Sequence, residues 1–394
     1  MKKLTSFLTF SIAFTIFSCS SSDSVSTPTE TYPNVIAAFS GKIDLNNLSN
    51  YATQSKPAYI TKDNTAGNPI TDKGATLGRV LFYDKNLSSN NTISCASCHI
   101  QANAFGDDTD ASDGVNGTTT RHAMRLVNSR FSNETKFFWD ERATTLEAQT
   151  SQPIQNHIEM GFSGTSGDGS ITTLITKLQA IGYYKELFKY VYGSEEITET
   201  KLQNALAQFI RSIQSFDSKY DTGRAAVQND NQPFSNFTAQ ENQGKNLFLT
   251  PPVFDTSGVR ISGGFGCAGC HAPPEFDIDP NTKNNGVIGV LNGTGIDITN
   301  TKAPSLRDLL NANGTPNGPM MHTGSFTTLQ NVIGHYGTIT IAPRNTNLDQ
   351  RLTPNGLGQQ LNINATEVTA LIAFIKTLTG TNVYTDPKWS SPFK

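Results

Sequence analysis

Residues 91–100, Asn-Thr-Ile-Ser-Cys-Ala-Ser-Cys-His-Ile, decide how the rest of the chain is interpreted. They place Cys95, Cys98 and His99 in the spacing Cys-x-x-Cys-His, which is the attachment signature of a c-type haem. Two thiols one helical turn apart can each bond to a porphyrin vinyl group, and the adjacent histidine can supply a ligand to iron. The spacing recurs over residues 267–271, Cys-Ala-Gly-Cys-His. Four of the five cysteines in 394 residues therefore lie in two copies of one pattern, which predicts two covalently bound haems.

A Cys-x-x-Cys pair also occurs in zinc knuckles and in thioredoxin-like redox sites. Neither of these sites requires a histidine directly after the second cysteine, and a zinc site shared by the four thiols would leave both histidines without a role. The haem interpretation uses all six residues, with iron bound by the histidines. These residues are Cys95, Cys98, His99, Cys267, Cys270 and His271.

The N-terminal residues 1–19 are typical of a secretory signal, with two lysines followed by an apolar stretch too short to span a bilayer. The stretch ends at Ile-Phe-Ser-Cys19, which resembles a bacterial lipobox, in which Cys19 becomes the lipidated first residue; an ordinary cleaved signal is the alternative. Residues 20–35 would then form a polar tether. We expect an exported lipoprotein, facing the periplasm or on the outer membrane, that meets the membrane only through a lipid anchor at Cys19.

The composition limits the class of protein. The net charge is −3 and only 16% of residues are charged, so no basic surface for nucleic acid is expected. Thirty-two glycines and 18 prolines interrupt the apolar patterns throughout. We therefore predict a mostly α-helical protein with long irregular loops, in which the prosthetic groups supply part of the core.

An internal repeat surrounds the two motifs. Residues 74–83 and 238–249 each read as a short helix that precedes one motif and contains Gly-x-x-Leu-Phe, the second opening with a Thr-x-x-Glu capping box. Residues 205–213, Ala-Leu-Ala-Gln-Phe-Ile-Arg-Ser-Ile, align without gaps on residues 370–378, Ala-Leu-Ile-Ala-Phe-Ile-Lys-Thr-Leu. Both have apolar residues at helical spacing.

The repeat predicts two cytochrome c-like haem domains, residues 36–235 and 236–394, with residues 217–236 as the linker.

Further motifs lie between and after the two haem signatures. They are residues 137–143 (Phe-Phe-Trp-Asp-Glu-Arg-Ala), 146–149 (Leu-Glu-Ala-Gln), 158–161 (Ile-Glu-Met-Gly), 303–307 (Ala-Pro-Ser-Leu-Arg) and 321–326 (Met-His-Thr-Gly-Ser-Phe). In this order, with two haem signatures, they resemble the bacterial dihaem cytochrome c peroxidase and MauG superfamily over nearly the whole mature chain.

The resemblance implies that Glu159 is the acid/base beside the first haem, that Gln149 is its neighbour and that Trp139 is an electron relay between the haems. The chemistry is consistent, because cleavage of a peroxide O–O bond requires a proton to move from one oxygen to the other, and a buried carboxylate can carry it. The alternatives are a solvated surface carboxylate for Glu159 and a packed core aromatic for Trp139.

The sixth ligand decides what each haem does. The loop 107–119, where the resemblance implies a ligand histidine, contains none, so the first haem is predicted to be open; the nearest histidine, His122, is expected to form hydrogen bonds instead. At the second haem the position fourteen residues after His322 is Tyr336, a MauG-like ligand, with His335 as the alternative.

Related proteins hold a calcium ion between their domains, and the matching positions are His122, Asn317 and Pro319. Imidazole is a poor ligand for calcium. Calcium binding is therefore left open.

The implied function is reduction of hydrogen peroxide with electrons from a small donor, a cytochrome c or a cupredoxin. The alternatives are MauG-like oxidation of a side chain of a partner protein and electron transfer without peroxide chemistry. The resemblance also allows for a homodimer.

Overall fold

The structure is a computed structural model that describes residues 31–133, 135–277 and 282–393, so the predicted signal and most of the predicted tether lie outside the described residues. Tyr32–Lys394 form one compact unit. Within the described part, no helix is long and apolar enough to cross a membrane. The protein is rich in helix with little sheet, as predicted.

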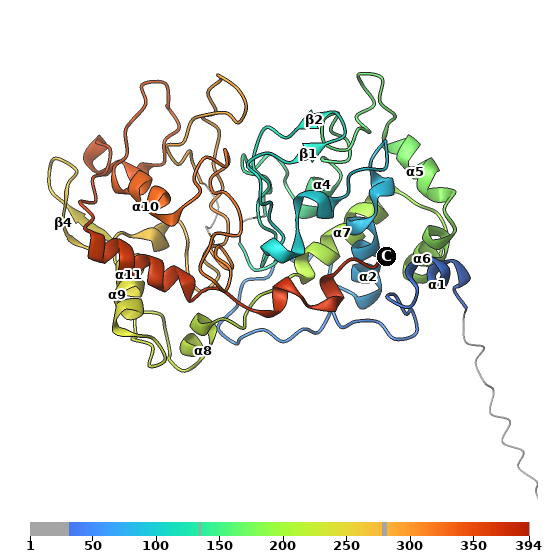
Figure 1. The fold of residues 1–394 in the computed structure, drawn as a ribbon, viewed down its shortest axis with the longest axis horizontal. Helices are drawn as coiled ribbons and strands as arrows, with labels where there is room; N and C mark the ends of the chain where they lie inside the picture. The colour runs from blue at the N-terminus through green and yellow to red at the C-terminus, as the bar shows by residue number, and fades with distance from the viewer. Residues whose placement is uncertain (1–30, 134, 278–281, 394) are drawn as a thin grey trace, which may run out of the picture. The chain divides into compact units, whose positions relative to one another are not determined.

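The elements follow in chain order and are labelled in Figure 1 where there is room. The α-helices are α1 (Pro33–Phe39), α2 (Asp72–Tyr83), α3 (Cys95–Cys98), α4 (Leu146–Thr150), α5 (Ile171–Gln179), α6 (Gly182–Tyr192), α7 (Glu199–Ser212), α8 (Lys219–Ala225), α9 (Ala239–Leu249), α10 (Leu329–Gly337) and α11 (Ala365–Lys376). Strand β1 (Asp113–Gly114) pairs antiparallel with β2 (Gly117–Thr118), and β3 (Pro252–Phe254) with β4 (Arg260–Gly263).

Helices α2 and α7 pack closely at a glycine. The α2 helix begins where Oγ1 of Thr71 accepts the N–H of Gly74 at 2.9 Å, which satisfies one of the free donors of the first turn. A β-carbon at Gly78 would lie 2.0 Å from the carbonyl oxygen of Ala205, so only glycine permits this approach.

Helices α9 and α11 repeat this arrangement and run side by side in Figure 1. The predicted capping box is present: the N–H of Thr238 donates to Glu241 at 2.6 Å, and the N–H of Glu241 donates to Thr238 at 3.1 Å. A β-carbon at Gly244 would lie 1.9 Å from the carbonyl oxygen of Ala370. The four predicted helices are confirmed, and the aligned sequence segments meet at equivalent positions.

The buried hydrophobic residues form two clusters. The first contains residues between Val35 and Ile213, and the second contains residues between Tyr220 and Leu378. Residues 217–236, which the sequence presents as the linker, carry helix α8 and place two fully buried rings, those of Tyr220 and Phe234, in the second cluster.

The C-terminal residues leave the second cluster and complete the first. Val383 and Trp389 belong to the first cluster, and Trp389 is 2% exposed. The carbonyl oxygens of Trp389 and Ser390 accept hydrogen bonds from Tyr83 at 2.6 Å and Arg79 at 2.7 Å, both on α2. The last residues of the chain therefore hold the helix that precedes the first Cys-x-x-Cys-His motif.

Candidate functional site

The first Cys-x-x-Cys-His motif is a single turn of helix, α3. The turn is closed at its start by the N–H of Ser94, which donates to Oγ of Ser97 at 3.0 Å. At its end the N–H of His99 donates to the carbonyl oxygen of Cys95 at 3.0 Å. This geometry places the two thiols one turn apart, with His99 at the end of the turn.

The second motif forms a tighter turn over Cys267–Gly269. It begins at Gly266, which has φ +65° and whose β-carbon would lie 2.8 Å from the ring of Pro252. The N–H of His271 donates to the carbonyl oxygen of Cys267 at 2.8 Å, as in the first copy. Both copies therefore present two thiols and a histidine in the same relation.

The two histidines are oriented in the same way. Nδ1 of His99 lies 3.1 Å from the carbonyl oxygen of Phe105, and Nδ1 of His271 lies 3.3 Å from that of Phe276. Because a carbonyl only accepts, the proton is on Nδ1, and Nε2 keeps a lone pair that is available to a metal ion. Burial lowers the pKa of His99 and lowers that of His271 to about 4, so both rings are neutral at pH 7.

The carbonyl-bearing loops were not identified from the sequence. Phe105 and Phe276 have φ of +59° and +60°, and each carbonyl also accepts the N–H of a leucine at 3.2 Å, Leu126 or Leu306. Phe105 follows His99 by six residues, whereas Phe276 follows His271 by five. An alignment of the two copies without gaps therefore does not match the two phenylalanines. The segments that contact these two carbonyl oxygens share the pattern Ala-x-x-Leu, at residues 123–126 and at 303–306. This pattern could have indicated the equivalent loops.

A cavity of about 460 Å³ opens beside the second motif. Its wall includes Cys267, Cys270 and His271, together with Trp139 and Tyr336. Apolar side chains of α9, α10 and α11 complete it, which suits a large flat apolar group.

The four thiols are largely removed from water. Burial raises the pKa of Cys95 and Cys267 to about 12 and that of Cys98 and Cys270 to about 11. Among the described residues, no three Cys, His, Asp or Glu side chains are grouped where they could hold a metal ion. The two thiol pairs therefore do not come together in one cluster.

The residues present fit a c-type haem. Each motif offers two neutral thiols and one imidazole nitrogen, and the second motif opens on an apolar cavity. The buried Nε of Arg125, another residue of the cavity wall, has no hydrogen-bond partner. A haem supplies the vinyl groups, the iron and the anionic propionates that these groups would bind.

Glu159 is held beside the first motif by the β1–β2 hairpin. The N–H of Val115 donates to the carbonyl oxygen of Glu159 at 3.1 Å, and a β-carbon at Gly114 would lie 2.1 Å from the carbonyl oxygen of Ile158, so the hairpin must be glycine here. Burial raises the pKa of the Glu159 carboxyl group, and the charge of Arg142 partly offsets this.

The Glu159 carboxylate also faces the first thiol pair. The pKa of Cys95 and that of Cys98 are raised chiefly by burial, and the negative charge of Glu159 adds to the effect at both thiols. The structure thus brings Glu159 to the first motif.

Gln149 lies on α4, which is capped by Oγ1 of Thr145 accepting the N–H of Ala148 at 3.0 Å. The Gln149 side chain is half-buried. No hydrogen bond joins it to the Glu159 carboxylate. The placement of Gln149 beside Glu159 stays a prediction.

Trp139 connects the two haem-motif regions. Its Nε1 donates to the carbonyl oxygen of His122 at 2.7 Å, and its carbonyl oxygen accepts the N–H of Lys302 at 2.8 Å. Its ring lies 6.4 Å, centroid to centroid, from that of His322, and it forms part of the cavity wall. An aromatic ring fixed at this place is suited to relay electrons.

Tyr336 points from α10 into the cavity, and burial raises the pKa of its hydroxyl group. Asn285 Nδ2 lies 3.5 Å from this hydroxyl and 3.4 Å from the sulfur of Met321. His335 instead places Nε2 3.0 Å from the carbonyl oxygen of Asn285 and does not line the cavity. Met320 and Met321 do line the cavity, and no sequence motif indicates that position for either residue.

Two of the positions matched to a calcium site form hydrogen bonds within the protein. Nδ1 of His122 lies 2.9 Å from the carbonyl oxygen of Thr109, and Nδ2 of Asn317 donates to the carbonyl oxygen of Asp308 at 2.7 Å. Pro319 lines the cavity.

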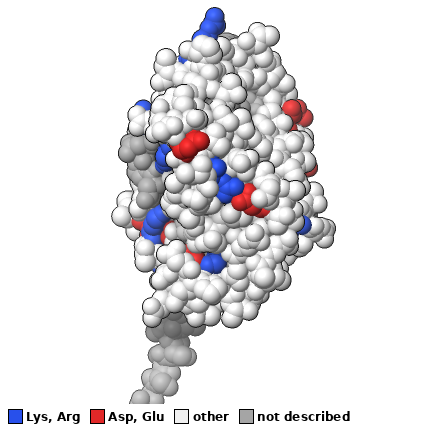
Figure 2. Space-filling model, turned by 90° about the vertical axis from the view of Figure 1, so that its left-hand side faces the viewer, with Lys and Arg blue, Asp and Glu red and all other residues white. Residues whose placement is uncertain are grey.

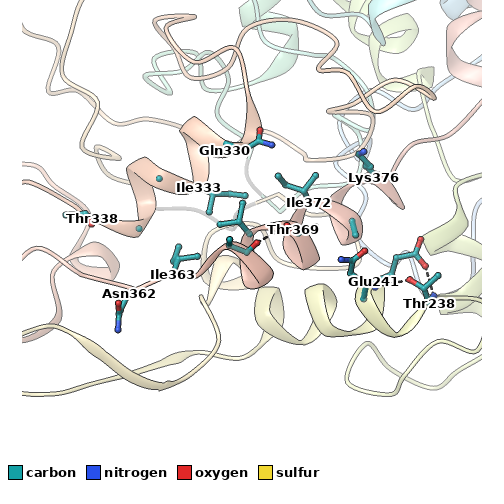
Figure 3. A pocket seen from close by; sticks show the side chains of 16 residues that line it. Thr238, Glu241, Gln330, Ile333, Thr338, Asn362, Ile363, Thr369, Ile372 and Lys376 are labelled. Carbon is teal, nitrogen blue, oxygen red and sulfur yellow. Dashed lines mark hydrogen bonds between the residues drawn. The ribbon is translucent and has the colours of Figure 1, made fainter.

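On the face shown in Figure 2, basic and acidic side chains are few and interspersed. An open groove of about 1100 Å³ lies between α10, α11 and the start of α9, and Figure 3 shows the side chains that line it. Ile333 and Ile363 line both this groove and the cavity, so these two side chains separate the second motif's cavity from solvent.

The two motifs and the cavity have the residues that a c-type cytochrome uses to hold haem. Residues 72–230 match the family model of di-haem cytochrome c peroxidase. The chain is 30% identical to the methylamine utilization protein MauG of Methylophilus methylotrophus, over 79% of this chain and 84% of that protein. It is 28% identical to the cytochrome c551 peroxidase of Nitrosomonas europaea, over 78% and 80% of the two chains.

The fold agrees with these matches. A crystal structure of a MauG-like protein associated with microbial copper homeostasis is similar, with a TM-score of 0.65 and 28% identity, over 86% of this chain and 99% of that one. The chain belongs to the di-haem cytochrome c peroxidase and MauG family. It is a peroxidase-type oxidoreductase that acts on hydrogen peroxide.

Proposed function

We propose that the chain binds two haems covalently, one at Cys95, Cys98 and His99 and one at residues 267–271, in the two domains 36–235 and 236–394. The reaction is reduction of hydrogen peroxide, H₂O₂ + 2 H⁺ + 2 e⁻ → 2 H₂O, with electrons from a small donor such as a cytochrome c or a cupredoxin. The principal support is the difference between the copies. In the first copy, the half-buried Glu159 lies near the thiols and burial raises the pKa of its carboxyl group. In the second copy, the carboxylate near the thiols, that of Asp349, is ion-paired with Arg351, and Tyr336 lines the cavity.

An iron held by His99 would supply the position at which peroxide binds. Glu159 accepts the proton of the bound peroxide and returns it to the departing oxygen, and burial tunes its pKa upward for that exchange. Gln149 stabilises the bound peroxide through its amide. Trp139 would relay electrons between the two haems, and Tyr336 would offer its oxygen to the second iron, which would favour the oxidised state of that iron.

The protein acts outside the cytoplasm. Residues 1–19 direct export, and the lipid on Cys19 anchors the mature chain. Haem attachment and delivery of electrons by a small redox protein both suit that location.

MauG-like oxidation of a partner protein is the second candidate, and Tyr336 together with the similarity to MauG favours it. A simple electron-transfer cytochrome is the third. It requires two six-coordinate irons, so low-spin EPR signals from both haems would favour it, whereas one high-spin ferric signal favours either enzyme.

The test is oxidation of reduced cytochrome c by peroxide with the purified two-haem protein. Glu159→Gln should lower the rate by about 10²–10⁴-fold, because the proton can no longer be transferred. Glu195→Gln, at an exposed position, is the matched control and should have the wild-type rate. Equal rates in all three proteins would remove Glu159 from the reaction.

A further inference from the structure

The side chain of Arg125 extends from a loop that follows the first motif in the sequence into the cavity beside the second motif. Its side chain packs on Gly106, where a β-carbon would lie 2.6 Å from Cγ of Arg125. Its Nη2 donates to the carbonyl oxygen of Ser305 at 3.1 Å, and the residue lines the cavity beside His271. Its positive charge is also felt at His271, whose pKa is lowered chiefly by burial and further by Arg125.

Comparison of the two copies of the internal repeat shows that only the first copy has a cation at this position. Leu126 and Leu306 donate their N–H groups to the equivalent carbonyl oxygens of Phe105 and Phe276, so the preceding residues, Arg125 and Ser305, are also equivalent. The repeat has an arginine in the first copy and a serine in the second. Arg125 is therefore a positive charge that has no equivalent in the second copy of the repeat.

The positive charge of Arg125 is not paired with a negative charge among the described residues. Nε is buried without a hydrogen-bond partner, and the guanidinium group forms no ion pair with a described carboxylate. Burial lowers the pKa of Arg125 to about 10, and Asp308 and Tyr384 offset only part of this effect. A buried cation without a paired anion is costly, so a group that brings an anion into the cavity would be favoured.

We propose that Arg125 binds a propionate of the haem attached at Cys267 and Cys270, and that it raises the reduction potential of that haem. The inference rests on the proposed attachment of two haems. The guanidinium group offers a bidentate surface for a carboxylate, and a fixed positive charge near iron favours the reduced, less positive state. A residue of the first domain thus sets the potential of the second haem.

The test is a redox titration of the two-haem protein, followed by EPR, with Arg125→Gln and Arg125→Lys. The signal of the second haem is identified as the one that changes in Met320→Leu, because Met320 lines the second cavity. The potential of this haem should fall in Arg125→Gln and stay close to wild type in Arg125→Lys. Loss of the second haem from Arg125→Gln, with retention in Arg125→Lys, would support the same pairing.

Arg344→Gln, at an exposed position outside the cavity, removes one positive charge and is the control for net charge. An unchanged second-haem potential in Arg125→Gln, or a fall confined to the first haem, would overturn the assignment. An equal fall in Arg344→Gln would do the same. Absence of covalent haem from the wild-type protein would instead overturn the proposed function.

Discussion

Trp139 and His122 are joined by a hydrogen bond of 2.7 Å from the indole Nε1 to the backbone carbonyl oxygen. The N–H of His122 in turn donates to the carbonyl oxygen of His322 at 2.8 Å, so the indole is fixed to segments from both halves of the chain. This relationship gives the relay hypothesis a defined geometry.

Trp139→Phe keeps an aromatic ring but removes the donor and the more easily oxidised indole. The rate of cytochrome c oxidation by peroxide should fall at least about tenfold, equivalent to ~1.4 kcal/mol of activation free energy. Binding of peroxide to the first haem, measured by stopped-flow absorbance, should be unchanged. A wild-type steady-state rate in a fully haem-loaded variant would exclude the relay.

Arg142→Gln should shift the pH dependence of the peroxidase rate. Arg142 lowers the pKa of Glu159, so its removal raises that pKa further above the ordinary value and makes the carboxylate scarcer at a given acidic pH. The acid limb of kcat/KM against pH should move to higher pH, with the wild-type rate recovered on the alkaline side. Arg142→Lys keeps the charge and should retain the wild-type limb, and a limb that is the same in all three proteins would contradict this role.

Removing either thiol pair should remove one haem. The double variant Cys95→Ala, Cys98→Ala and the double variant Cys267→Ala, Cys270→Ala should each contain one covalent haem per chain by the pyridine haemochrome assay, against two in the wild type. A wild-type chain with bound zinc and no haem would refute the attachment.

Tyr336→Phe removes the proposed oxygen ligand. The second haem should gain high-spin ferric character by EPR, and its reduction potential should rise, because an anionic oxygen favours ferric iron. His335→Gln should leave the spectrum unchanged, since His335 faces the carbonyl oxygen of Asn285. The opposite pattern would make His335 the ligand.

Gly244→Ala should destabilise the protein, because the new β-carbon would meet the carbonyl oxygen of Ala370 at 1.9 Å and one helix must move. Overpacking of this kind costs about 1–3 kcal/mol, enough to exceed the gain from a better helix former. Thermal unfolding followed by circular dichroism measures the effect. Gly67→Ala, where a β-carbon meets nothing within 4 Å, is the control and should be neutral or slightly stabilising.

The helices could be predicted from the sequence because their signals are local. Gly-x-x-Leu-Phe, the Thr238 capping box and the aligned segments at 205–213 and 370–378 each depend on neighbouring residues only, and the structure has helices at all of these places. The haem signatures are equally local.

The remaining parts of the site depend on contacts between distant segments. The carbonyl partners of the two histidines lie on loops with positive φ at phenylalanine, which no propensity indicates. In the sequence, nothing distinguishes Arg125 from other basic residues. Its place in the cavity depends on its contact with Ser305, which is distant in the sequence. Met321 lies in the cavity wall near Asn285, which also contacts Tyr336 of α10, and these residues are distant from one another in the sequence.

The position of Trp389 has a consequence for the order in which the protein is completed. This ring fills the first core, although it follows the whole second cluster in the sequence. Without residues 389 and 390, α2 lacks the backbone acceptors that hold Arg79 and Tyr83. The first core is therefore expected to be completed only after the second half of the chain has been synthesised.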